Sequence, residues 1–302
     1  MASADGHGAV ETIEAAPAKI NLALHVTGQR EDGYHLLETL VTFTLAGDVL
    51  HFREAEEDGF SISGRFAPEL MASGSSENLV LKARDLFRNF AVKNGSGTRS
   101  VAIHLEKNLP IASGIGGGSA DAAAALRGLR RHWNLEIGDL TLQDMALALG
   151  ADVPMCLTSR PLIARGIGEK IEQLSRFPNL SLVLANPLKG VSTPHIFRLL
   201  TEKSNPSLPP IVDDNEAGGL QMLRRLRNDL QPSAISLLPE IDTILSMLSS
   251  EGAELARMSG SGATCFGIFP TIQKAKAAAA ALRQTQPGWY VQETMTIAGR
   301  TS

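Results

Sequence analysis

Four glycines within five residues mark the stretch Pro110-Ile111-Ala112-Ser113-Gly114-Ile115-Gly116-Gly117-Gly118-Ser119-Ala120. Because glycine has no Cβ atom, the backbone N–H groups of such a stretch can crowd around an anion. A strand pattern, with apolar residues alternating over 101–106, ends before it, and an alanine-rich helix pattern over 121–133 follows. The start of a helix adds unpaired N–H donors and the positive end of its dipole. The stretch therefore predicts a phosphate-binding loop that suits a triphosphate, with all its residues as candidate contacts.

The known motifs of other glycine-rich loops do not match this sequence. The P-loop pattern needs a lysine directly after its last glycine, where this chain has Ser119. The dinucleotide pattern GxGxxG fails at the same residue when it is counted from Gly114. The His-Arg-Asp and Asp-Phe-Gly triplets of protein kinases are absent from the sequence. A mobile hairpin is the remaining alternative, and the regular elements on both sides of the stretch disfavour it.

The composition limits the class of protein. The chain has 302 residues, 43% hydrophobic and 20% charged, which is an ordinary balance for two domains or one large α/β domain. Its net charge of -4 argues against a general nucleic-acid or anionic-membrane surface, because such surfaces carry a basic excess. No apolar run approaches the roughly 18 residues of a membrane span. We therefore expect neither a nucleic acid nor a membrane as partner.

The cysteines and the N-terminus indicate a reducing compartment. Cys156 and Cys265 are the two cysteines, and neither lies in a CxxC pair. We expect two small buried thiols, in preference to a disulfide or a metal site. Residues 1–9 are small, polar and acidic, so we expect a disordered lead-in and no signal peptide. Without a targeting signal, the expected location is the cytoplasm.

Both halves of the chain mix helix and strand patterns, which favours the α+β class. Residues 10–26 predict a strand, an irregular stretch at Pro17 and a second strand. Residues 203–219 are rich in chain breakers and predict a long surface loop. We place the domain boundary near Arg160. The expected division is a lead-in over 1–9, an N-terminal ATP-binding domain over 10–160 and a C-terminal domain over 161–302.

Three polar side chains outside the loop are candidates for chemistry. Lys19 and Asn21 face the same side of a strand, because side chains alternate with a period of two. Asp152 directly follows a helix end, where the dipole disfavours a carboxylate, so it needs a cationic partner or a function. An aspartate paired with a lysine can orient a hydroxyl group and take its proton. The alternatives are two solvated side chains and an exposed turn aspartate.

Two further stretches are less specific. Tyr34 and His35 follow a turn, and their rings can stack on a nucleobase, although a packed tyrosine beside a surface histidine fits equally well. Residues 259–264 read Ser-Gly-Ser-Gly-Ala-Thr. Alone this second glycine loop is a turn, and beside the first loop it is a support for the phosphate site.

Together and in this order, the motifs resemble the three signatures of the GHMP kinase superfamily. These are Pro-Ala-Lys-Ile-Asn-Leu at 17–22, the glycine stretch at 110–120 and the loop at 259–264. Four longer stretches are similar to the 4-diphosphocytidyl-2-C-methyl-D-erythritol kinases within that superfamily, and they lie at 19–35, 150–154, 165–169 and 191–197. The resemblance covers nearly the whole chain from about Ala15, and residues 203–219 fall outside it.

The resemblance implies a fold and an activity. The implied fold is a two-domain GHMP kinase fold, with a ribosomal-protein-like N-terminal domain packed on a ferredoxin-like C-terminal domain and the site in the cleft. The implied reaction is ATP-dependent phosphorylation of the 2-hydroxyl of 4-diphosphocytidyl-2-C-methyl-D-erythritol in the non-mevalonate route to isoprenoids. Other superfamily members, such as homoserine or mevalonate-type kinases, are disfavoured by Gly33-Tyr34-His35. A non-catalytic sensor on the same fold is disfavoured because Lys19, Asp152 and the loop glycines are all present.

The resemblance also implies roles for single residues. Lys19 and Asp152 are the implied catalytic pair, and the implied substrate contacts are Asn21, Tyr34, His35, Ile167, Thr193 and Phe197. Among these, Tyr34, His35 and Phe197 would lie near the cytosine of a cytidine diphosphate substrate. Arg198 stands where members of the family carry lysine, which keeps the charge but replaces a point charge by a planar fork. We expect Mg²⁺ to arrive with ATP, held mainly by phosphates, and we predict neither a protein metal site nor an oligomeric state.

Overall fold

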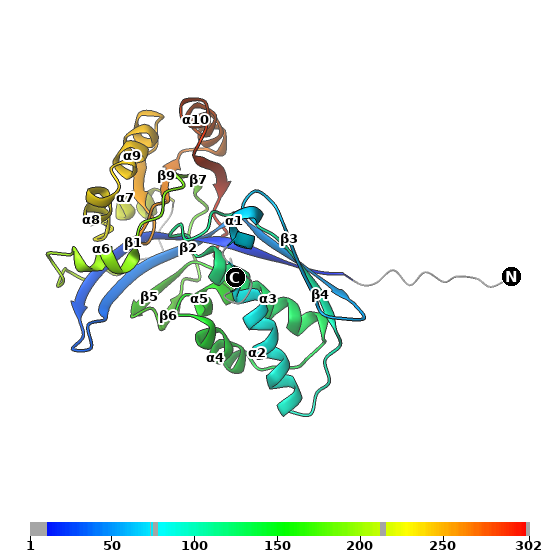
Figure 1. Cartoon of the computed structure of the whole chain (residues 1–302). Coiled ribbons are helices and arrows are strands. Elements are labelled where there is room, and N and C mark those ends of the chain that lie inside the picture. The colour runs from blue at the N-terminus through cyan, green and yellow to red at the C-terminus, as the bar shows by residue number, and fades with distance from the viewer. Residues whose placement is uncertain (1–10, 73, 75–77, 212–215, 300–302) are drawn as a thin grey trace.

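Two sheets organise the chain. The computed structural model describes residues 11–72, 74, 78–211 and 216–299. A six-stranded sheet and a four-stranded sheet pack on each other, and helices cover the outer side of both (Figure 1). The mixture of helices with largely antiparallel sheets confirms the predicted α+β class.

The larger sheet is built around one long hairpin. Its two strands are β1 (Thr12–Gln29) and β2 (His35–Glu54), and the four remaining strands lie on either side of β2 in the order β3-β4-β2-β5-β6. These four are β3 (Gly59–Ser63), β4 (Val101–Glu106), β5 (Leu162–Gly166) and β6 (Lys170–Gln173). β3 pairs with β4 in parallel, and the other pairs of this sheet are antiparallel.

One continuous strand replaces the two predicted over residues 10–26. β1 runs past Pro17, so the prediction of two separate strands is wrong, and the predicted irregularity is a local break in register within one strand. Pro17 lies opposite Gly47 at a β-bulge, where the register shifts before Lys19. A bulge leaves a residue outside the ladder, so the missing N–H of proline is tolerated there. The same bulge frees the N–H of Lys19, which donates to the carbonyl of Ile115 at 2.9 Å.

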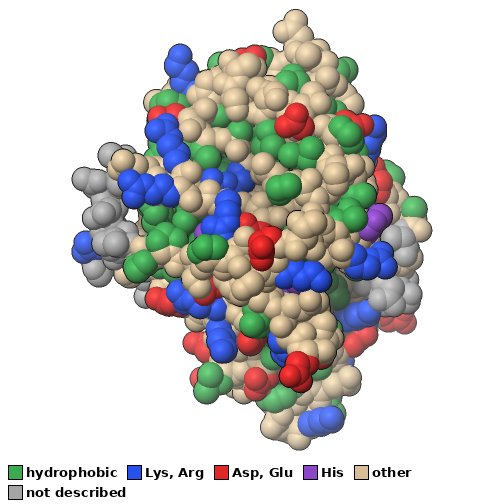
Figure 2. All heavy atoms as spheres, turned by 90° about the vertical axis from the view of Figure 1, so that its left-hand side faces the viewer, with side chains coloured by type: hydrophobic (Ala, Val, Ile, Leu, Met, Phe, Trp, Pro, Cys, Tyr) green, Lys and Arg blue, Asp and Glu red, His purple; other side chains and the backbone are tan. Residues whose placement is uncertain are grey.

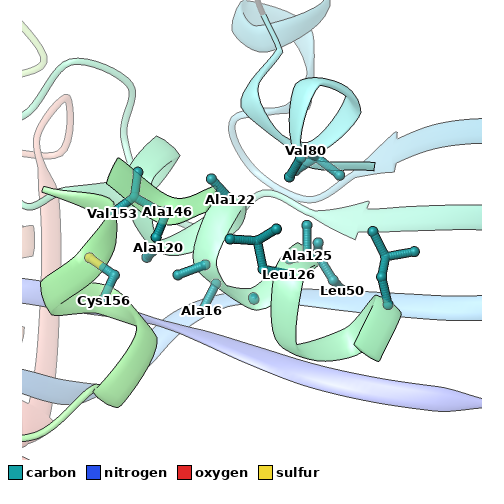
Figure 3. Close-up of a cluster of buried hydrophobic side chains, with 14 of the residues drawn as sticks. Ala16, Leu50, Val80, Ala120, Ala122, Ala125, Leu126, Ala146, Val153 and Cys156 are labelled. Carbon is teal, nitrogen blue, oxygen red and sulfur yellow. The ribbon is translucent and has the colours of Figure 1, made fainter. Parts of the chain in front are cut away.

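Helices cover one face of the larger sheet (Figure 1). They are α2 (Leu79–Lys93), α3 (Gly117–His132), α4 (Asp139–Leu149) and α5 (Val153–Thr158). The alanines of α3 let it lie close to the strands, and Figure 3 shows Ala125 and Leu126 packed beside Leu50 of β2. A Cβ atom at Gly128 would come within 2.2 Å of the Phe52 ring, so glycine is required at that close approach. The predicted alanine-rich helix is confirmed, and it begins earlier than expected, inside the glycine stretch.

The smaller sheet has the order β10-β7-β9-β8. Its strands are β7 (Ser181–Asn186), β8 (Leu255–Met258), β9 (Cys265–Phe269) and β10 (Tyr290–Met295). Helices α9 (Glu240–Ser250) and α10 (Ile272–Thr285) pack on one face of it through a separate apolar core. This βαββαβ arrangement is that of the ferredoxin-like fold, with three shorter helices inserted after β7. They are α6 (Thr193–Arg198), α7 (Glu216–Arg225) and α8 (Gln231–Leu237).

A third core joins the two sheets. Ile20 and Leu22 of β1 pack with Leu182, Phe266 and other residues of the smaller sheet. Arg257, buried in β8, crosses this junction and donates to the carbonyl oxygens of three residues, which are Leu22, Leu223 and Leu226. Burial lowers the pKa of Arg257 to about 10, and the guanidinium is satisfied by carbonyl dipoles. The junction therefore fixes β1, which carries Lys19 and Asn21, relative to the smaller sheet.

The division of the chain near Arg160 stays a prediction. β5 and β6 follow that point, yet β5 pairs with β2 and extends the larger sheet to Gln173. The reason is that a hairpin placed after α5 satisfies the free edge of β2. Within residues 203–219, the last part belongs to α7, and residues 1–9 and 212–215 lie outside the described residues.

The remaining helix, α1 (Ala67–Ala72), lies beside β3. Among the described residues, no helix has the length and apolar character needed to cross a membrane. The face in Figure 2 shows Lys and Arg side chains interspersed with Asp and Glu, with no continuous basic patch.

Candidate active site

The glycine stretch joins β4 to α3 and ends as the start of that helix. Gly116 is the N-cap residue, with φ at 66°, and α3 begins at Gly117. The first N–H groups of a helix have no carbonyl partner within it, so they remain available to an anion. A Cβ atom at Gly116 would lie 3.2 Å from the side chain of Lys19, and one at Gly114 would lie 2.6 Å from the carbonyl oxygen of Gly262. The glycines thus bring this loop against β1 and against the second glycine loop.

Lys19 and Asp152 form an ion pair at the centre of the site. The Nζ atom of Lys19 lies 2.8 Å from Oδ2 of Asp152, although the two residues are 133 positions apart. The side chain of Lys19 is 7% exposed, whereas that of Asp152 is 44% exposed. The lysine is therefore held inside the protein, and the carboxylate reaches the open cleft.

Asp152 stands between two helices. It follows Gly150, the C-cap residue of α4, and it is the N-cap residue of α5. The charge of Lys19 holds the pKa of Asp152 below its ordinary value, although burial opposes this shift. The cationic partner expected for this carboxylate is therefore present.

Asn21 contributes an unpaired acceptor to the same cleft. Its Nδ2 atom donates to the hydroxyl of Thr39 at 2.8 Å, and its backbone N–H donates to the hydroxyl of Ser259 at 3.0 Å. Its buried Oδ1 atom has no hydrogen-bond partner among the described residues. A buried amide oxygen without a partner costs free energy unless a ligand or water supplies the donor. Lys19 and Asn21 both line the cleft. They therefore face the same side of β1, as the alternation of side chains predicts.

The second glycine loop packs directly on the first. The hydroxyl of Ser259 donates to the carbonyl of Gly114 at 3.2 Å, and the N–H of Thr264 donates to the carbonyl of Ser113 at 3.1 Å. Asn228 donates through Nδ2 to the carbonyl of Gly260 at 2.8 Å and holds the loop from the other side. The sequence of residues 259–264 allows two interpretations, either a simple turn or a segment that supports the first loop. This geometry matches the second interpretation.

A cleft of about 450 Å³ gathers most of the predicted site residues. It is lined by Lys19, Asn21, Ala112, Ser113, Gly114, Gly116, Gly117, Gly118, Ser119, Asp152, Ile167, Thr193 and Phe197. Pro110 and Ile111 line a smaller cavity on another side of the loop, and the side chains of Ile115 and Ala120 are buried in the cores. Those last two residues shape the loop from beneath.

An aromatic cavity of about 570 Å³ adjoins this cleft and shares Thr193 and Phe197 with it. The ring of His35 stacks on the ring of Phe197 with centroids 4.8 Å apart. Tyr34 also lines the cavity and is 63% exposed. The structure therefore brings Tyr34, His35 and Phe197 together around one cavity. Within this group, Phe197 stacks on His35.

Comparisons with known proteins agree with this geometry. A model of the GHMP kinase N-terminal domain matches residues 78–160, and one of the GHMP kinase C-terminal domain matches residues 211–288. A 4-diphosphocytidyl-2-C-methyl-D-erythritol kinase of Agrobacterium fabrum is 63% identical over 96% of this chain and 98% of its own length. The chain belongs to the GHMP kinase family. A second 4-diphosphocytidyl-2-C-methyl-D-erythritol kinase, from Rhizobium etli, is 58% identical over 95% of both chains.

Solved structures of other kinases resemble this GHMP kinase in fold. A crystal structure of 4-(cytidine 5'-diphospho)-2C-methyl-D-erythritol kinase superposes with a TM-score of 0.77 at 31% identity, covering 96% of this chain and all of the other. A homoserine kinase of Cytophaga hutchinsonii has a TM-score of 0.67 at 16% identity, covering 99% of this chain and 98% of the other, and shares the fold. The predicted two-domain fold and family membership are confirmed.

A buried ion cluster beneath the loop of this GHMP kinase was not foreseen. Lys107 donates through Nζ to Oδ2 of Asp48 at 2.5 Å and to Oδ2 of Asp121 at 2.7 Å. All three side chains are nearly inaccessible. A Cβ atom at Gly117 would lie 3.1 Å from the Nζ atom of Lys107, so the cluster lies directly under the helix start. The available signal was Asp121 itself, a carboxylate inside an alanine-rich helix.

The cluster holds its charges in a fixed pattern. Asp48 also accepts the N–H groups of Asn108 at 2.5 Å and Leu109 at 2.8 Å, so it ties the cluster to the chain that follows β4. Burial raises the pKa of Asp121 to about 8, against the lowering effect of Lys107. Burial alone would lower the pKa of Lys107, but the charges of Asp121 and Asp48 raise it on balance. The lysine therefore stays protonated beneath the loop.

Asn78 and Lys107 line a further cavity of about 260 Å³, which the sequence did not indicate. This cavity shares Leu79, Ala112 and Gly118 with the main cleft, so it opens beside the loop. Asn78 is the N-cap residue of α2 and accepts the N–H of Val80 through its side chain. Among the described residues, no cluster of three or more His, Cys, Asp or Glu side chains has the geometry of a metal site.

Proposed function

We propose that this chain transfers the γ-phosphoryl group of ATP to the 2-hydroxyl group of 4-diphosphocytidyl-2-C-methyl-D-erythritol. The observation that carries the proposal is the Lys19–Asp152 pair, which opens to a cleft between the glycine loop and the aromatic cavity. A donor phosphate, a reacting pair and an aromatic pocket in that order match a kinase whose acceptor ends in a nucleobase.

The donor half of the site is the loop and the start of α3. We assign the β- and γ-phosphates of ATP to the N–H groups of Gly117 and its neighbours. The cavity lined by Asn78, Leu79 and Ile111 opens beside the loop, and we assign the nucleoside of ATP to it; Lys107, only 3% exposed, lies at its floor. Glycine at 114 and 116 is needed for this cradle, because Cβ atoms there would meet backbone or Lys19.

Mg²⁺ belongs to the donor half. The oxygen atoms near the loop suit a hard cation, since the hydroxyl of Ser119 and the carboxylate of Asp152 line the same cleft. The ion would neutralise phosphate charge, with the phosphates supplying most of its ligands. Asp152 remains tied to Lys19 at 2.8 Å, so its carboxylate is oriented by the protein itself.

The acceptor half runs from the cleft into the aromatic cavity. We assign the nucleobase to the cavity of His35 and Phe197, where stacking surface is available. The hydroxyls of Thr193 and Ser261 lie 2.7 Å apart at the passage to the cleft, where the diphosphate would pass. The reacting hydroxyl then lies near Lys19, Asn21 and Asp152, and the free Oδ1 atom of Asn21 can accept from a substrate hydroxyl.

The reaction needs orientation more than a strong base. A bond forms between the acceptor oxygen and the γ-phosphorus, the bond to the β–γ bridging oxygen breaks, and ADP leaves. The proton of the hydroxyl passes to the carboxylate of Asp152. Because Lys19 lowers the pKa of Asp152, this carboxylate is a weak base, and the loose transition state of phosphoryl transfer demands little base strength before the bond forms. Lys19 fixes the carboxylate and offsets the charge that develops.

The direct test is phosphoryl transfer from Mg-ATP to 4-diphosphocytidyl-2-C-methyl-D-erythritol, with the product identified by mass. We expect a product heavier by one phosphoryl group from the wild type and essentially none from Asp152→Asn. Homoserine and mevalonate serve as control acceptors, and we expect no product from either. Transfer to a control acceptor in place of the cytidine compound would contradict the proposal.

A further inference from the structure

The aromatic cavity receives one cation from a segment that the family resemblance does not cover. Its lining combines the β1–β2 turn, helix α6 and Lys203 from the chain that follows α6. Aromatic rings together with cations suit an aromatic ligand that carries hydrogen-bond acceptors. Lys203 thus stands in a binding cavity without an assigned role.

Lys203 is held in place by its surroundings. Its Nζ atom donates to Oε1 of Gln29 at 3.2 Å. Two residues further on, Asn205 donates to the carbonyl of Val26 through its backbone N–H at 3.0 Å and through Nδ2 at 3.1 Å. Leu208 is buried in the core between the sheets. The segment is therefore strapped across the end of β1, and it carries Lys203 to the rim of the cavity.

His35 lines the same cavity and has one unsatisfied polar atom. Its Nε2 atom is buried and has no hydrogen-bond partner among the described residues, while its ring stacks on Phe197. Burial first, and then the charge of Lys203, lower the pKa of His35, so the ring is neutral at neutral pH. The other charged groups that line the cavity are Asp32, which pairs with Arg30 at 2.6 Å, and Arg198. The Lys203 ammonium therefore lies near enough to the imidazole of His35 for its charge to act on the ring, and both residues line the cavity that would hold the ligand.

We propose that Lys203 is a specificity-determining residue for the nucleobase end of the acceptor, donating to an acceptor atom on the edge of the base beside Nε2 of His35. This role rests on the proposed function. Thr193 and Phe197 line both the cleft and the aromatic cavity, whereas Lys203 lines the aromatic cavity and not the cleft. The phosphates must run toward the cleft, so the ammonium lies on the side of the base. Cytosine offers a ring nitrogen and a carbonyl oxygen as neighbouring acceptors on one edge.

Binding titrations without turnover test this assignment. Cytidine, CMP and CDP are titrated into the wild type and into Lys203→Met, which removes the charge and keeps the length of the side chain. We expect a loss of roughly three- to tenfold in affinity, because one charge-assisted hydrogen bond at a partly exposed site disappears. The loss should be the same factor for all three ligands. Lys203→Arg should retain most of the affinity, and Lys93→Met, an exposed lysine at the end of α2, should bind like the wild type.

Two results would overturn the assignment. If the loss of affinity in Lys203→Met grows from cytidine to CDP, the ammonium lies at the phosphates. If Lys203→Met binds all three ligands as tightly as the wild type does, Lys203 has no role in recognition. A pH titration of the His35 imidazole by NMR reports on the position independently of any ligand. We expect its pKa to rise in Lys203→Met toward the ordinary value, and an unchanged pKa would contradict the arrangement.

Failure of the proposed function is distinguishable from failure of this inference. If the wild type does not phosphorylate the cytidine acceptor but Lys203→Met still weakens cytidine and CDP equally, the reaction is wrong and the role of Lys203 stands. If the acceptor is phosphorylated and the affinities of Lys203→Met match the wild type, the reaction stands and the role of Lys203 is wrong.

Discussion

Two lysine–carboxylate clusters flank the glycine loop, and they differ in one property. Lys19 pairs with Asp152 next to Gly116, and Lys107 pairs with Asp48 and Asp121 beneath Gly117. Both lysines are almost inaccessible. The carboxylate of Asp152 is 44% exposed to the cleft, whereas those of Asp48 and Asp121 are 0% and 5% exposed.

This difference separates chemistry from support. A carboxylate open to the cleft can exchange contact with Lys19 for contact with a substrate hydroxyl, at little cost in desolvation. A sealed cluster has no such exchange, and removal of one partner leaves uncompensated charge in the interior. Adjacent glycines therefore connect a reactive ion pair to a fixed foundation under the same loop. Changes in the open pair should alter turnover, and changes in the sealed cluster should alter stability.

The largest effect is expected in the open pair. Asp152→Asn keeps the shape of the side chain and removes the proton acceptor, so we expect kcat to fall by about 10²- to 10⁴-fold. Substrate binding should change little, and thermal stability should fall less than in the sealed cluster, because the amide oxygen at position 152 can still accept from Lys19 at the edge of the open cleft. Steady-state kinetics with Mg-ATP and the cytidine acceptor, together with a melting curve, measure both. A variant with near-normal kcat would remove Asp152 from the role of base.

The sealed cluster should respond in the opposite way. Lys107→Met leaves Asp48 and Asp121 buried without their cation, so we expect the free energy of unfolding to fall by about 3–5 kcal/mol. Urea unfolding followed by circular dichroism gives this value. Lys93→Met is the matched control, since Lys93 lies exposed at the end of α2, and it should stay within about 0.5 kcal/mol of the wild type.

A loss of stability below about 1 kcal/mol for Lys107→Met would break the comparison. It would mean that the cluster contributes no more than a surface ion pair. The double variant Lys107→Met/Asp48→Asn sharpens the test. Asp121 holds a proton in the folded chain, so Asp48 is the carboxylate that the loss of Lys107 leaves stranded, and replacing it by an amide should recover part of the loss.

The sequence predicted the loop and missed its foundation, for a physical reason. The glycine stretch, the strand before it and the alanine-rich helix after it are local patterns, and each was recognisable by itself. The foundation is assembled from β2, the end of β4 and α3. Asp48 and Lys107 are 59 positions apart, and neither has an unusual neighbour in the sequence. Only packing shows that they meet.

The same distinction applies to the candidate residues. The alternation of side chains predicted that Lys19 and Asn21 share a face, and they do, but the strand continues through Pro17 because a bulge absorbs it. The family resemblance, and not the spacing, suggested Phe197 and Thr193. Lys203 lay in a segment without a recognisable pattern, so its place beside His35 follows from the fold alone.

The pH dependence of stability should expose the proton in the sealed cluster. The folded pKa of Asp121, about 8, lies above its ordinary value of 3.8, so between these values the folded chain holds a proton that the unfolded chain has released. Stability from this group is therefore present at low pH and is lost as pH rises through the window, with a slope of at most about 1.4 kcal/mol per pH unit. Asp121→Asn cannot titrate. Unfolding at pH 5, 6, 7 and 8 should show a flatter decline in Asp121→Asn, and parallel curves would contradict the buried proton.

The smallest effects should come from Gly116 and Gly117. These two residues are adjacent in the sequence, yet each faces a different lysine cluster, so their alanine variants compare the two clusters directly. Gly116→Ala places a Cβ atom 3.2 Å from the Lys19 side chain at a φ of 66°, where a non-glycine residue is strained by about 1–2 kcal/mol. Part of that strain should displace Lys19, so kcat should fall several-fold. Gly117→Ala instead meets the Lys107 ammonium at 3.1 Å and should lower stability by about 1 kcal/mol with a smaller loss of kcat. Equal kcat losses in the two variants would mean that the loop moves as one body and that the clusters are not separate.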